Sequence, residues 1–350
     1  MKPNSVIQED IKTILAEKIE WGCMEGKTVL VTGASGFIPS YVIYTLMELN
    51  ATRFQDNPMT VLALVRNKEK ADKKFSQFSS REDFRLIVSD VSEPVELCEK
   101  TDIIIHAASQ ASPKYYGVDP VGTLKANTLG TANMLELARR GGAEKFMYIS
   151  SGDVYGVLDG SVSVVTESYT GNVDITNVRS CYAESKRMGE NMCVCWSYQY
   201  GFHVNMLRLS HTYGPGVELD DGRVFGDFVK NVLQNEDIRL NSDGKAKRSF
   251  VYISDMIIGL FRVLFNGENG HAYNIAADSE TEIRELASML CGLYPGKKLS
   301  VRFNEAAMSA GYIRSASTVA ALSAEKLKKL GWKQQVSIEQ GFRRMIESYI

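Results

Sequence analysis

The sequence predicts an α/β protein with a doubly wound parallel sheet and a smaller α+β lobe, on three observations. Short apolar runs rich in β-branched residues alternate with helical segments along most of the chain. The first of these runs leads directly into a glycine-containing loop, Thr32–Ile38, which a helical segment follows. The later part of the chain is more irregular and more helical. These patterns are typical of a Rossmann-type sheet with a second lobe built from later, non-contiguous segments.

The composition is that of a globular protein without a basic excess. The chain has 350 residues, 44% apolar and 23% charged, which is enough to bury a substantial core. Forty Lys and Arg against 42 Asp and Glu give a net charge of −2, so a nucleic-acid partner is not expected. No apolar run approaches the ~18 to 20 residues of a membrane span, and the start of the chain lacks a signal-peptide pattern. We therefore expect a cytoplasmic protein without a membrane partner.

The cysteines and histidines do not predict a metal site or a disulfide framework. The six cysteines are scattered and form no CxxC pair, so we expect them to be reduced. The four histidines show no HExxH spacing, and the lone CxC of Cys193 and Cys195 is read as two small residues on a helix.

The elements are expected in the following order. Ile7, Ile11, Leu15 and Ile19 have helical spacing and predict an amphipathic helix over residues 5–21, within an extension of residues 1–26. Residues 27–212 are expected to form a dinucleotide-binding domain, joined by later strands near 250–276. Residues 213–249 and 281–350 are expected to form the substrate-binding lobe. Strands are predicted at Thr28–Thr32, Val61–Val65, Leu86–Val88, Ile103–Ile105, Phe146–Ser150, Val204–Leu209 and Ala272–Ile275.

The loop after the first strand is the predicted pyrophosphate site of a dinucleotide. Glycine permits the tight turn there, and the N-terminus of the following helix favours a negative charge. Pro39 occupies the place of the third glycine of the usual fingerprint, and proline is tolerated in a first helical turn. The cofactor-binding candidates in this loop are Gly33, Ser35, Gly36, Phe37 and Ile38.

The ends of the second and third strands supply further cofactor candidates. Arg66 stands where an acidic residue would hydrogen-bond the ribose of NAD, and a cation there suits the 2′-phosphate of NADP. A solvated strand-end arginine is the alternative. Asp90 and Val91 end the third strand and are expected to meet the adenine ring. The cofactor is therefore NADP or NAD, with NADP favoured by Arg66.

Small residues end the fourth strand, where a backbone must pass close to a cofactor. They are Ala107, Ala108 and Ser109. His106 precedes them, and we expect a packed, hydrogen-bonded histidine and not a catalyst.

A serine loop and a Tyr-x-x-x-Lys pattern form the catalytic candidates. Ser151 and Asp153 follow the fifth strand, and Tyr182 and Lys186 share one face of a later helix. A free tyrosine titrates near ~10, so a nearby cation is needed to favour the phenolate that acts as a base at neutral pH. Tyr182 and Lys186 are also counted among the cofactor-binding residues.

With these motifs in this order, the sequence resembles the extended short-chain dehydrogenases, the NAD-dependent nucleotide-sugar epimerase/dehydratase family. The resemblance covers roughly residues 27–331 and is greatest for UDP-glucuronate decarboxylases. It is carried by the runs Ala111–Pro113, Asp119–Pro120, Arg179–Arg187, Thr212–Pro215, Asp221–Val224 and Arg248–Tyr252.

The resemblance implies roles for individual residues. Ser151, Tyr182 and Lys186 would be the proton-transfer set, and Asp153 the acid used by decarboxylases and dehydratases. The substrate-binding residues would be Ser112, His211, Arg223 and Arg248, with the two arginines facing the nucleotide diphosphate, as guanidinium forks suit phosphate. Surface salt bridges are the alternative for both arginines. The resemblance also implies a homodimer formed through helices near residues 123–139 and 182–200.

The sequence departs from the family pattern at four places. His211 replaces an asparagine, Asp153 is one methylene shorter than the usual glutamate, and Gly152 replaces the second acid of dTDP-glucose dehydratases. The segment Tyr312–Ser317 stands in place of the basic segment that decarboxylases use around the sugar acid. These departures leave the sugar undetermined.

Three functions are therefore weighed. The first is a nucleotide-sugar-modifying enzyme in which hydride leaves and returns to a sugar carbon, expected to be C4, around a decarboxylation, elimination or epimerisation. The second is an NADPH-dependent reductase of a nucleotide-linked keto sugar. The third is a cofactor-binding regulatory protein without turnover, since fold alone does not prove activity.

Overall fold

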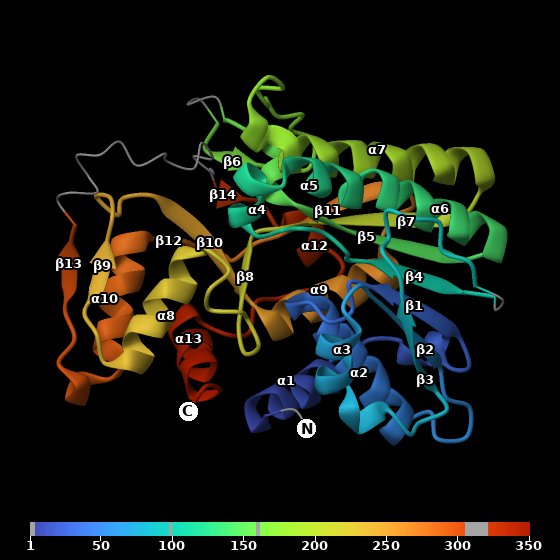
Figure 1. The fold of residues 1–350 in the computed structure, drawn as a ribbon, viewed down its shortest axis with the longest axis horizontal. Coiled ribbons are helices and arrows are strands. Elements are labelled where there is room, and N and C mark those ends of the chain that lie inside the picture. Colours follow the sequence, from blue (N-terminus) through green and yellow to red (C-terminus); the bar gives the residue numbers. More distant parts are fainter. Residues whose placement is uncertain (1–3, 98–99, 159–161, 305–320) are drawn as a thin grey trace.

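A seven-stranded parallel sheet carries the larger part of the molecule (Figure 1). The computed structural model describes residues 4–97, 100–158, 162–304 and 321–350. The strand order is β11-β7-β5-β4-β1-β2-β3, and every neighbouring pair is parallel. This confirms the predicted fold class. The strands are β1 (Thr28–Thr32), β2 (Thr60–Val65), β3 (Phe84–Val88), β4 (Ile103–His106), β5 (Lys145–Ser151), β7 (His203–Leu209) and β11 (His271–Ile275).

Helices cover both faces of this sheet (Figure 1). Because both faces are covered, the central strands read as continuous apolar runs such as Thr28–Thr32 and not as alternating ones. One face carries α1 (Ser5–Ala16), α2 (Phe37–Thr52), α3 (Lys68–Lys74) and α9 (Ile253–Asn266), and the other carries α5 (Pro120–Asn127), α6 (Leu129–Gly141) and α7 (Cys181–Tyr200).

The predicted N-terminal helix is shorter than residues 5–21, because α1 ends at Ala16. A 3-10 helix, Trp21–Met24, follows it after a short extended stretch. Trp21 is buried against Phe261 of α9, with ring centroids 4.8 Å apart. Packing of this ring therefore decides the local conformation where the apolar spacing alone suggested a longer helix.

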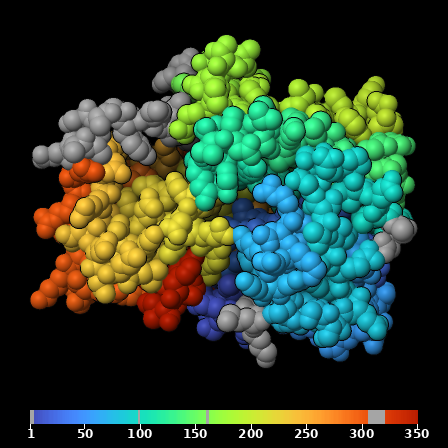
Figure 2. Space-filling model, in the orientation of Figure 1, coloured from blue at the N-terminus to red at the C-terminus, as the bar shows by residue number. Residues whose placement is uncertain are grey.

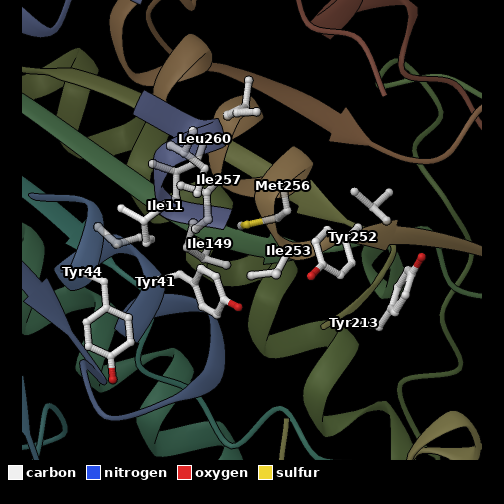
Figure 3. Packing of buried hydrophobic residues seen from close by; sticks show 14 of the residues in the cluster. Ile11, Tyr41, Tyr44, Ile149, Tyr213, Tyr252, Ile253, Met256, Ile257 and Leu260 are labelled. Atoms are coloured by element: carbon white, nitrogen blue, oxygen red, sulfur yellow. The ribbon is translucent and has the colours of Figure 1, made fainter. Parts of the chain in front are cut away.

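A buried carboxylate joins α1 to three other elements. Asp10 accepts hydrogen bonds from Tyr41 of α2 (3.1 Å) and from Tyr252 of β10 (Lys247–Tyr252; 2.9 Å). It also pairs with Arg344 of α13 (Ile338–Glu347), at 2.8 Å. Tyr41 and Tyr252 lie side by side with Ile253 and Met256 in the apolar cluster of Figure 3. The first helix of the chain, α1, is thus joined through Asp10 to α2, to β10 and to the last helix, α13.

The smaller lobe contains short strands and amphipathic helices from the later chain (Figure 1). Of the strands found where later strands were expected, near 250–276, β11 joins the large sheet and β10 lies in a separate sheet between β12 and β8. The strands of the lobe are β8 (His211–Tyr213), β9 (Ile238–Leu240), β10, β12 (Glu280–Glu282) and β13 (Val301–Phe303), and its helices are α8 (Val224–Gln234), α10 (Ile283–Leu293) and α13.

Short elements complete the described chain. They are α4 (Pro113–Val118), α12 (Glu325–Lys328), the strands β6 (Val164–Val165) and β14 (Ala321–Leu322), and the 3-10 helices η1 (Trp21–Met24), η2 (Ser76–Phe78), η3 (Gly152–Tyr155), η4 (Val178–Ser180) and η5 (Pro295–Lys297). No helix among the described residues is long and apolar enough to span a membrane. Within the same ranges, no cluster of three or more His, Cys, Asp or Glu could hold a metal ion.

Candidate active site

A cavity of about 300 Å³ opens at the carboxyl ends of β1, β4 and β5. The molecular surface is hollowed there, between the smaller lobe and the first strands and helices (Figure 2). Ligands of open α/β sheets bind at this edge. The cavity brings together Gly33, Gly36, Phe37, Ile38, Ala107, Ala108, Ser109, Ser151, Asp153, Tyr182, Lys186, His211, Arg223 and Arg248 of the predicted site residues.

The glycine loop has the geometry expected of a pyrophosphate cradle. Gly33 has φ +64°, and a Cβ on it would come within 2.8 Å of the Cα of Ala108, so only glycine fits there. Gly36 is the N-cap of α2, whose first amides have no partner within the helix. Pro39 falls in the first turn and leaves the 16-residue helix continuous. These residues therefore fit the diphosphate of a dinucleotide.

Five predicted site residues are not among those that line this cavity. Arg66 and Asp90 end neighbouring strands, and their charged groups are 3.8 Å apart. Burial raises the pKa of Asp90, but hydrogen bonds from Ser92 and the charge of Arg66 outweigh it and lower the pKa. The other three are Ser35, Val91 and Ser112. The Val91 carbonyl accepts a hydrogen bond from the Asn133 side-chain amide, and the Ser112 hydroxyl donates one to the Asp221 carbonyl.

His106 is confirmed as a packed histidine. It is 1% exposed, and its two ring nitrogens lie 2.8 Å from the Thr32 hydroxyl and 3.1 Å from the Thr131 hydroxyl. Burial, together with the Lys186 charge, lowers its pKa to about 3 and keeps it neutral.

The proton-transfer candidates meet at one end of the cavity. Tyr182 and Lys186 lie in the first turns of α7, and the Tyr182 hydroxyl hydrogen-bonds to Ser151 at the end of β5. The Lys186 ammonium donates to the Ile149 carbonyl at 2.7 Å and lies 5.9 Å from the centre of the Tyr182 ring. Burial lowers the pKa of Lys186 to about 7. Burial and the Asp153 charge raise the pKa of Tyr182, so the protein alone holds the phenol protonated.

Asp153 lies on η3, two residues after Ser151. Its backbone amide donates to the Ser151 hydroxyl at 3.1 Å, which fixes the turn. Burial raises the pKa of its carboxyl, while the charges of Arg248 and Arg179 oppose the change. A carboxyl with a raised pKa in a cavity is suited to take up and release a proton.

The other end of the cavity is cationic. His211 of β8, Arg223 at the N-cap of α8 and Arg248 of β10 converge there from three elements. Burial lowers the pKa of His211 to about 3, and both arginine charges contribute, so the imidazole is neutral. Arg223 lies 3.4 Å from Asp221, whereas Arg248 donates to the Lys247 carbonyl at 2.8 Å. The two guanidiniums suit phosphate oxygens.

Sequence reasoning missed several lining residues, of which Tyr116 is the most informative. Its ring stacks on that of Tyr182, with centroids 4.9 Å apart and planes 15° apart. Its hydroxyl donates to the Ala111 carbonyl at 3.0 Å. A sequence signal was present, because Pro113 is typical of the first position of a helix and so places Tyr116 one turn into α4. The other missed residues are Pro39, Ala111, Pro113, Ile149, Ser150, Gly152, Leu209, Ser210, Thr212, Ser249 and Leu322.

Comparisons with known proteins extend these observations. Residues 29–276 match the model of the NAD dependent epimerase/dehydratase family. The chain is similar to UDP-glucuronic acid decarboxylase 5 of Arabidopsis thaliana, with 34% identity over 93% of this chain and 90% of the relative. It is also similar to UDP-glucuronic acid decarboxylase 6 of the same plant, with 39% identity over 74% and 72%.

Solved structures share the fold at lower identity. UDP-glucose 4-epimerase of Thermotoga maritima, solved with UDP-glucose, has a TM-score of 0.78 and 22% identity, over 92% of this chain and 98% of that one. UDP-glucuronic acid 4-epimerase of Bacillus cereus, solved with UDP-glucuronic acid and NAD, has a TM-score of 0.76 and 23% identity over the same shares.

Proposed function

The chain belongs to the NAD dependent epimerase/dehydratase family, and we propose that it is an enzyme that modifies a UDP-linked sugar through transient oxidation at a sugar carbon, C4 by family resemblance. The observation that carries the proposal is the arrangement of Ser151, Tyr182 and Lys186 at one end of a cavity whose other end holds Arg223 and Arg248. A diphosphate at the cationic end would direct the attached sugar toward the tyrosine.

The glycine loop fits the diphosphate of the cofactor, because Gly33 (φ +64°) makes a turn that packs closely against Ala108 and leads into the N-terminus of α2. A bound nicotinamide would supply the hydride chemistry, as acceptor and then donor of the hydride at the sugar carbon. We propose that Arg66 lets the site accept NADP as well as NAD, because its exposed guanidinium replaces the acid that would repel a 2′-phosphate. The nearby Asp90 limits that preference, because its charge offsets part of the guanidinium charge.

The residues of the chain perform the proton chemistry. Tyr182 takes the proton of the sugar hydroxyl, and Ser151 holds the same oxygen by a hydrogen bond. The Lys186 ammonium favours the phenolate and hence this transfer. Asp153 handles a proton at the carbon next to the transient ketone, and burial, which raises the pKa of its carboxyl, favours the protonated form that can donate one.

Decarboxylation of UDP-glucuronate is the first reaction to test, because the curated relatives with this name align over most of the chain. Purified protein is incubated with UDP-glucuronate, UDP-glucose and UDP-N-acetylglucosamine, and the products are followed by mass spectrometry and anion-exchange chromatography. Loss of CO₂ from UDP-glucuronate is expected, with Tyr182→Phe as the inactive control. A change of retention without a change of mass would indicate epimerisation. Failure to convert any of these sugars would overturn the proposal.

A reductase is the second candidate, favoured by Arg66 at the end of β2 and by Gly152, which replaces one acid of the loop. A reductase would consume NADPH in stoichiometric amounts with a nucleotide-linked keto sugar. A redox-neutral enzyme would show no net change in absorbance of the reduced cofactor. The segment Tyr312–Ser317, which bears on recognition of a sugar acid, lies outside the described residues.

We also propose a homodimer formed through the helices on the α7 side of the sheet. Exposed apolar side chains lie on all three of these helices: Val121 and Leu124 of α5, Leu129 of α6, and Met188, Val194 and Tyr198 of α7. Such side chains are typical of an interface. Light scattering of the wild type and of Leu124→Glu tests it, with a dimer and a monomer as the expected masses.

A further inference from the structure

Glu190 is a buried carboxylate that lies one helical turn beyond Lys186 on α7. It is 7% exposed, while Tyr182 and Lys186 are 7% and 2% exposed. The spacing of four residues places Tyr182, Lys186 and Glu190 on one face of the helix, which packs on β5. A buried carboxylate is costly unless it is paired, so its partners indicate what it does.

Lys186 and Glu190 bind consecutive residues of β5. The Lys186 ammonium donates to the Ile149 carbonyl at 2.7 Å, and the buried Ser150 hydroxyl donates to Glu190 Oε1 at 2.5 Å. The next residue along the strand is Ser151. The contacts of Lys186 with Ile149 and of Glu190 with Ser150 therefore hold α7 against the end of β5, and so set the distance between Ser151 and Tyr182.

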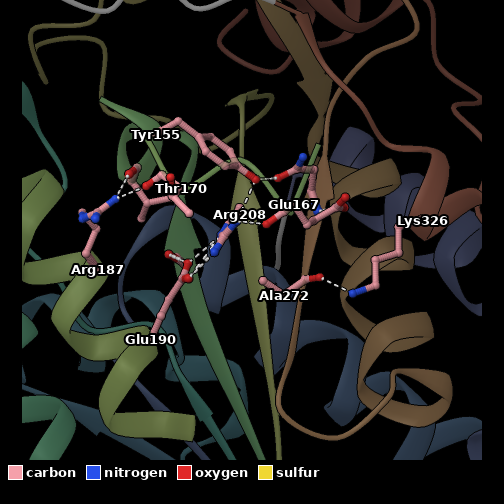
Figure 4. Close-up of polar contacts among 11 residues, drawn as sticks. Tyr155, Glu167, Thr170, Arg187, Glu190, Arg208, Ala272 and Lys326 are labelled. Atoms are coloured by element: carbon pink, nitrogen blue, oxygen red, sulfur yellow. Dashed lines mark hydrogen bonds and ion pairs between the residues drawn. The ribbon is translucent and has the colours of Figure 1, made fainter. Parts of the chain in front are cut away.

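Arg208 of β7 holds the carboxylate from the other side (Figure 4). Its Nε and Nη2 donate to Glu190 at 3.0 and 2.6 Å. Its Nη1 donates to the Tyr155 hydroxyl at 2.8 Å and to the Glu167 carbonyl at 3.1 Å. This bidentate pairing fixes the orientation of the carboxylate, so Ser150 meets an oxygen that cannot swing away.

The charge of Glu190 also acts on Lys186. Burial lowers the pKa of Lys186 to about 7, and the charge of Glu190 is the largest opposing effect, followed by that of Cys193. Arg208 shares the carboxylate and reduces its effect. The groups that face the ammonium from the surrounding elements are Tyr182, Glu190 and Cys193 of α7, Tyr148 of β5, and His106 of β4, which is neutral.

We propose that Glu190 is a positioning residue for the proton-transfer set, which anchors the end of β5 through Ser150 and supplies the counter-charge of Lys186. The proposal rests on the proposed function, because it assigns Glu190 a role in the reaction of that same site. Glu190 acts only through Ser150 and Lys186 and needs no contact with a ligand.

The charge is tested with Glu190→Gln, which keeps the size of the side chain and an acceptor for Ser150. The pKa of Lys186 is read without any substrate, from the pH dependence of its acetylation by acetic anhydride, followed by peptide mass spectrometry. Only the neutral amine reacts. We expect the midpoint to fall by about 1 pH unit, as the loss of a nearby opposite charge predicts. An unchanged acetylation midpoint of Lys186 would overturn the claim that Glu190 supplies its counter-charge.

The anchoring is tested with Ser150→Ala, which removes the hydroxyl and keeps every charge. We expect kcat to fall roughly tenfold, because small misplacements of reacting groups are costly. The KM for the nucleotide sugar and the acetylation midpoint of Lys186 should not change. Full kcat in this variant would overturn the anchoring.

Two further variants keep the result interpretable. Glu136→Gln removes an exposed carboxylate from α6, where it pairs with Arg139, and should match the wild type in kcat and midpoint. If Glu190→Gln does not fold, Glu190→Asp keeps the charge on a shorter side chain. This variant should keep the acetylation midpoint of Lys186 and have a lower kcat. An unchanged kcat would count against the anchoring of β5 by Glu190. A wild type that converts no sugar would contradict the proposed function, while the acetylation midpoints would still report on the counter-charge.

Discussion

The two ends of the cavity are built in different ways. The catalytic end comes from one strand end and one helix, and its groups are buried, with Tyr182 and Lys186 almost inaccessible to solvent. The cationic end comes from β8, the N-cap of α8 and β10, and its arginines are half-buried. Burial raises the pKa of Tyr182 and lowers the pKa of Lys186 to about 7. At the cationic end burial also lowers the pKa of Arg248, but a guanidinium stays charged at neutral pH.

This difference separates chemistry from binding. Groups whose pKa values are shifted by burial are suited to proton transfer, and charges held at a rim are suited to a phosphate that enters from solvent. Changes at the catalytic end should therefore lower kcat, and changes at the cationic end should raise KM. Each of the following predictions can contradict that separation.

The largest effect is expected from Tyr182→Phe. The variant keeps the ring that stacks on Tyr116 and removes only the hydroxyl that transfers the proton. We expect kcat to fall by about 10²- to 10⁴-fold, with cofactor and nucleotide-sugar affinity nearly unchanged. Steady-state kinetics and calorimetric titration measure the two quantities. An equal loss of affinity would mean that the two ends are not separable.

Arg248→Met tests the cationic end. A hydrogen bond to a charged group contributes ~1.5 to 3 kcal/mol, so the affinity for UDP should fall by about 10- to 100-fold with kcat kept within about threefold. Arg302→Met removes an exposed guanidinium that pairs with Asp237 and serves as the matched control. A fall in kcat as large as the rise in KM would show that Arg248 acts mainly on Asp153.

Asp153→Asn changes a residue between the two ends, because the Asp153 backbone amide donates to Ser151 while its carboxyl is acted on by the Arg248 charge. We expect overall turnover to fall at least roughly tenfold, the low end for an acid-base group, with little loss of sugar-nucleotide affinity. Asp174→Asn, in an exposed loop, is the control. If Asp153→Asn keeps full activity, the redox-neutral cycle loses its second acid and the reductase becomes the better account.

The smallest effect is expected from Arg66→Asp, outside the lining of the cavity. The side chain is 69% exposed and lies 3.8 Å from Asp90, so we expect the ratio of NADP to NAD affinity to fall by about tenfold. Fluorescence titration with both cofactors measures the ratio. Wild-type protein that binds NAD far more tightly than NADP would refute the role of Arg66.

Local patterns predicted the sheet well, because each central strand is a β-branched run with both faces buried. Thr28–Thr32 has the predicted bounds, and the other strands differ by one or two residues at their ends. The helix after residue 5 was predicted too long, since the burial of Trp21 depends on α9, far along the chain. A strand near residue 250 was expected in the large sheet, but β10 pairs with β8 and β12. Its apolar run predicts a strand and does not show which strands it pairs with.

The site was predictable to the extent that its residues lie on short motifs. Gly33, Gly36, Tyr182 and Lys186 belong to such motifs and reach one cavity. Leu322 lines it from a distant strand with no local signal. Ser112 was expected at the substrate, but its hydroxyl is engaged with the Asp221 carbonyl, a contact that spacing along the chain does not reveal. Its role stays a prediction, as do the roles of the other candidate site residues.

The carboxylate of Asp10 has a mechanical consequence for the cavity. Its partners come from different parts of the molecule, Tyr41 from α2 on the large sheet and Tyr252 and Arg344 from β10 and α13 of the smaller lobe. A rigid rotation of one part against the other would leave a buried charge without partners. Breaking such a pairing costs about 3 to 5 kcal/mol. The span between the glycine loop and the two arginines is therefore stiff. A sugar nucleotide would then bind in a cavity of fixed width, without rotation of the lobe against the sheet.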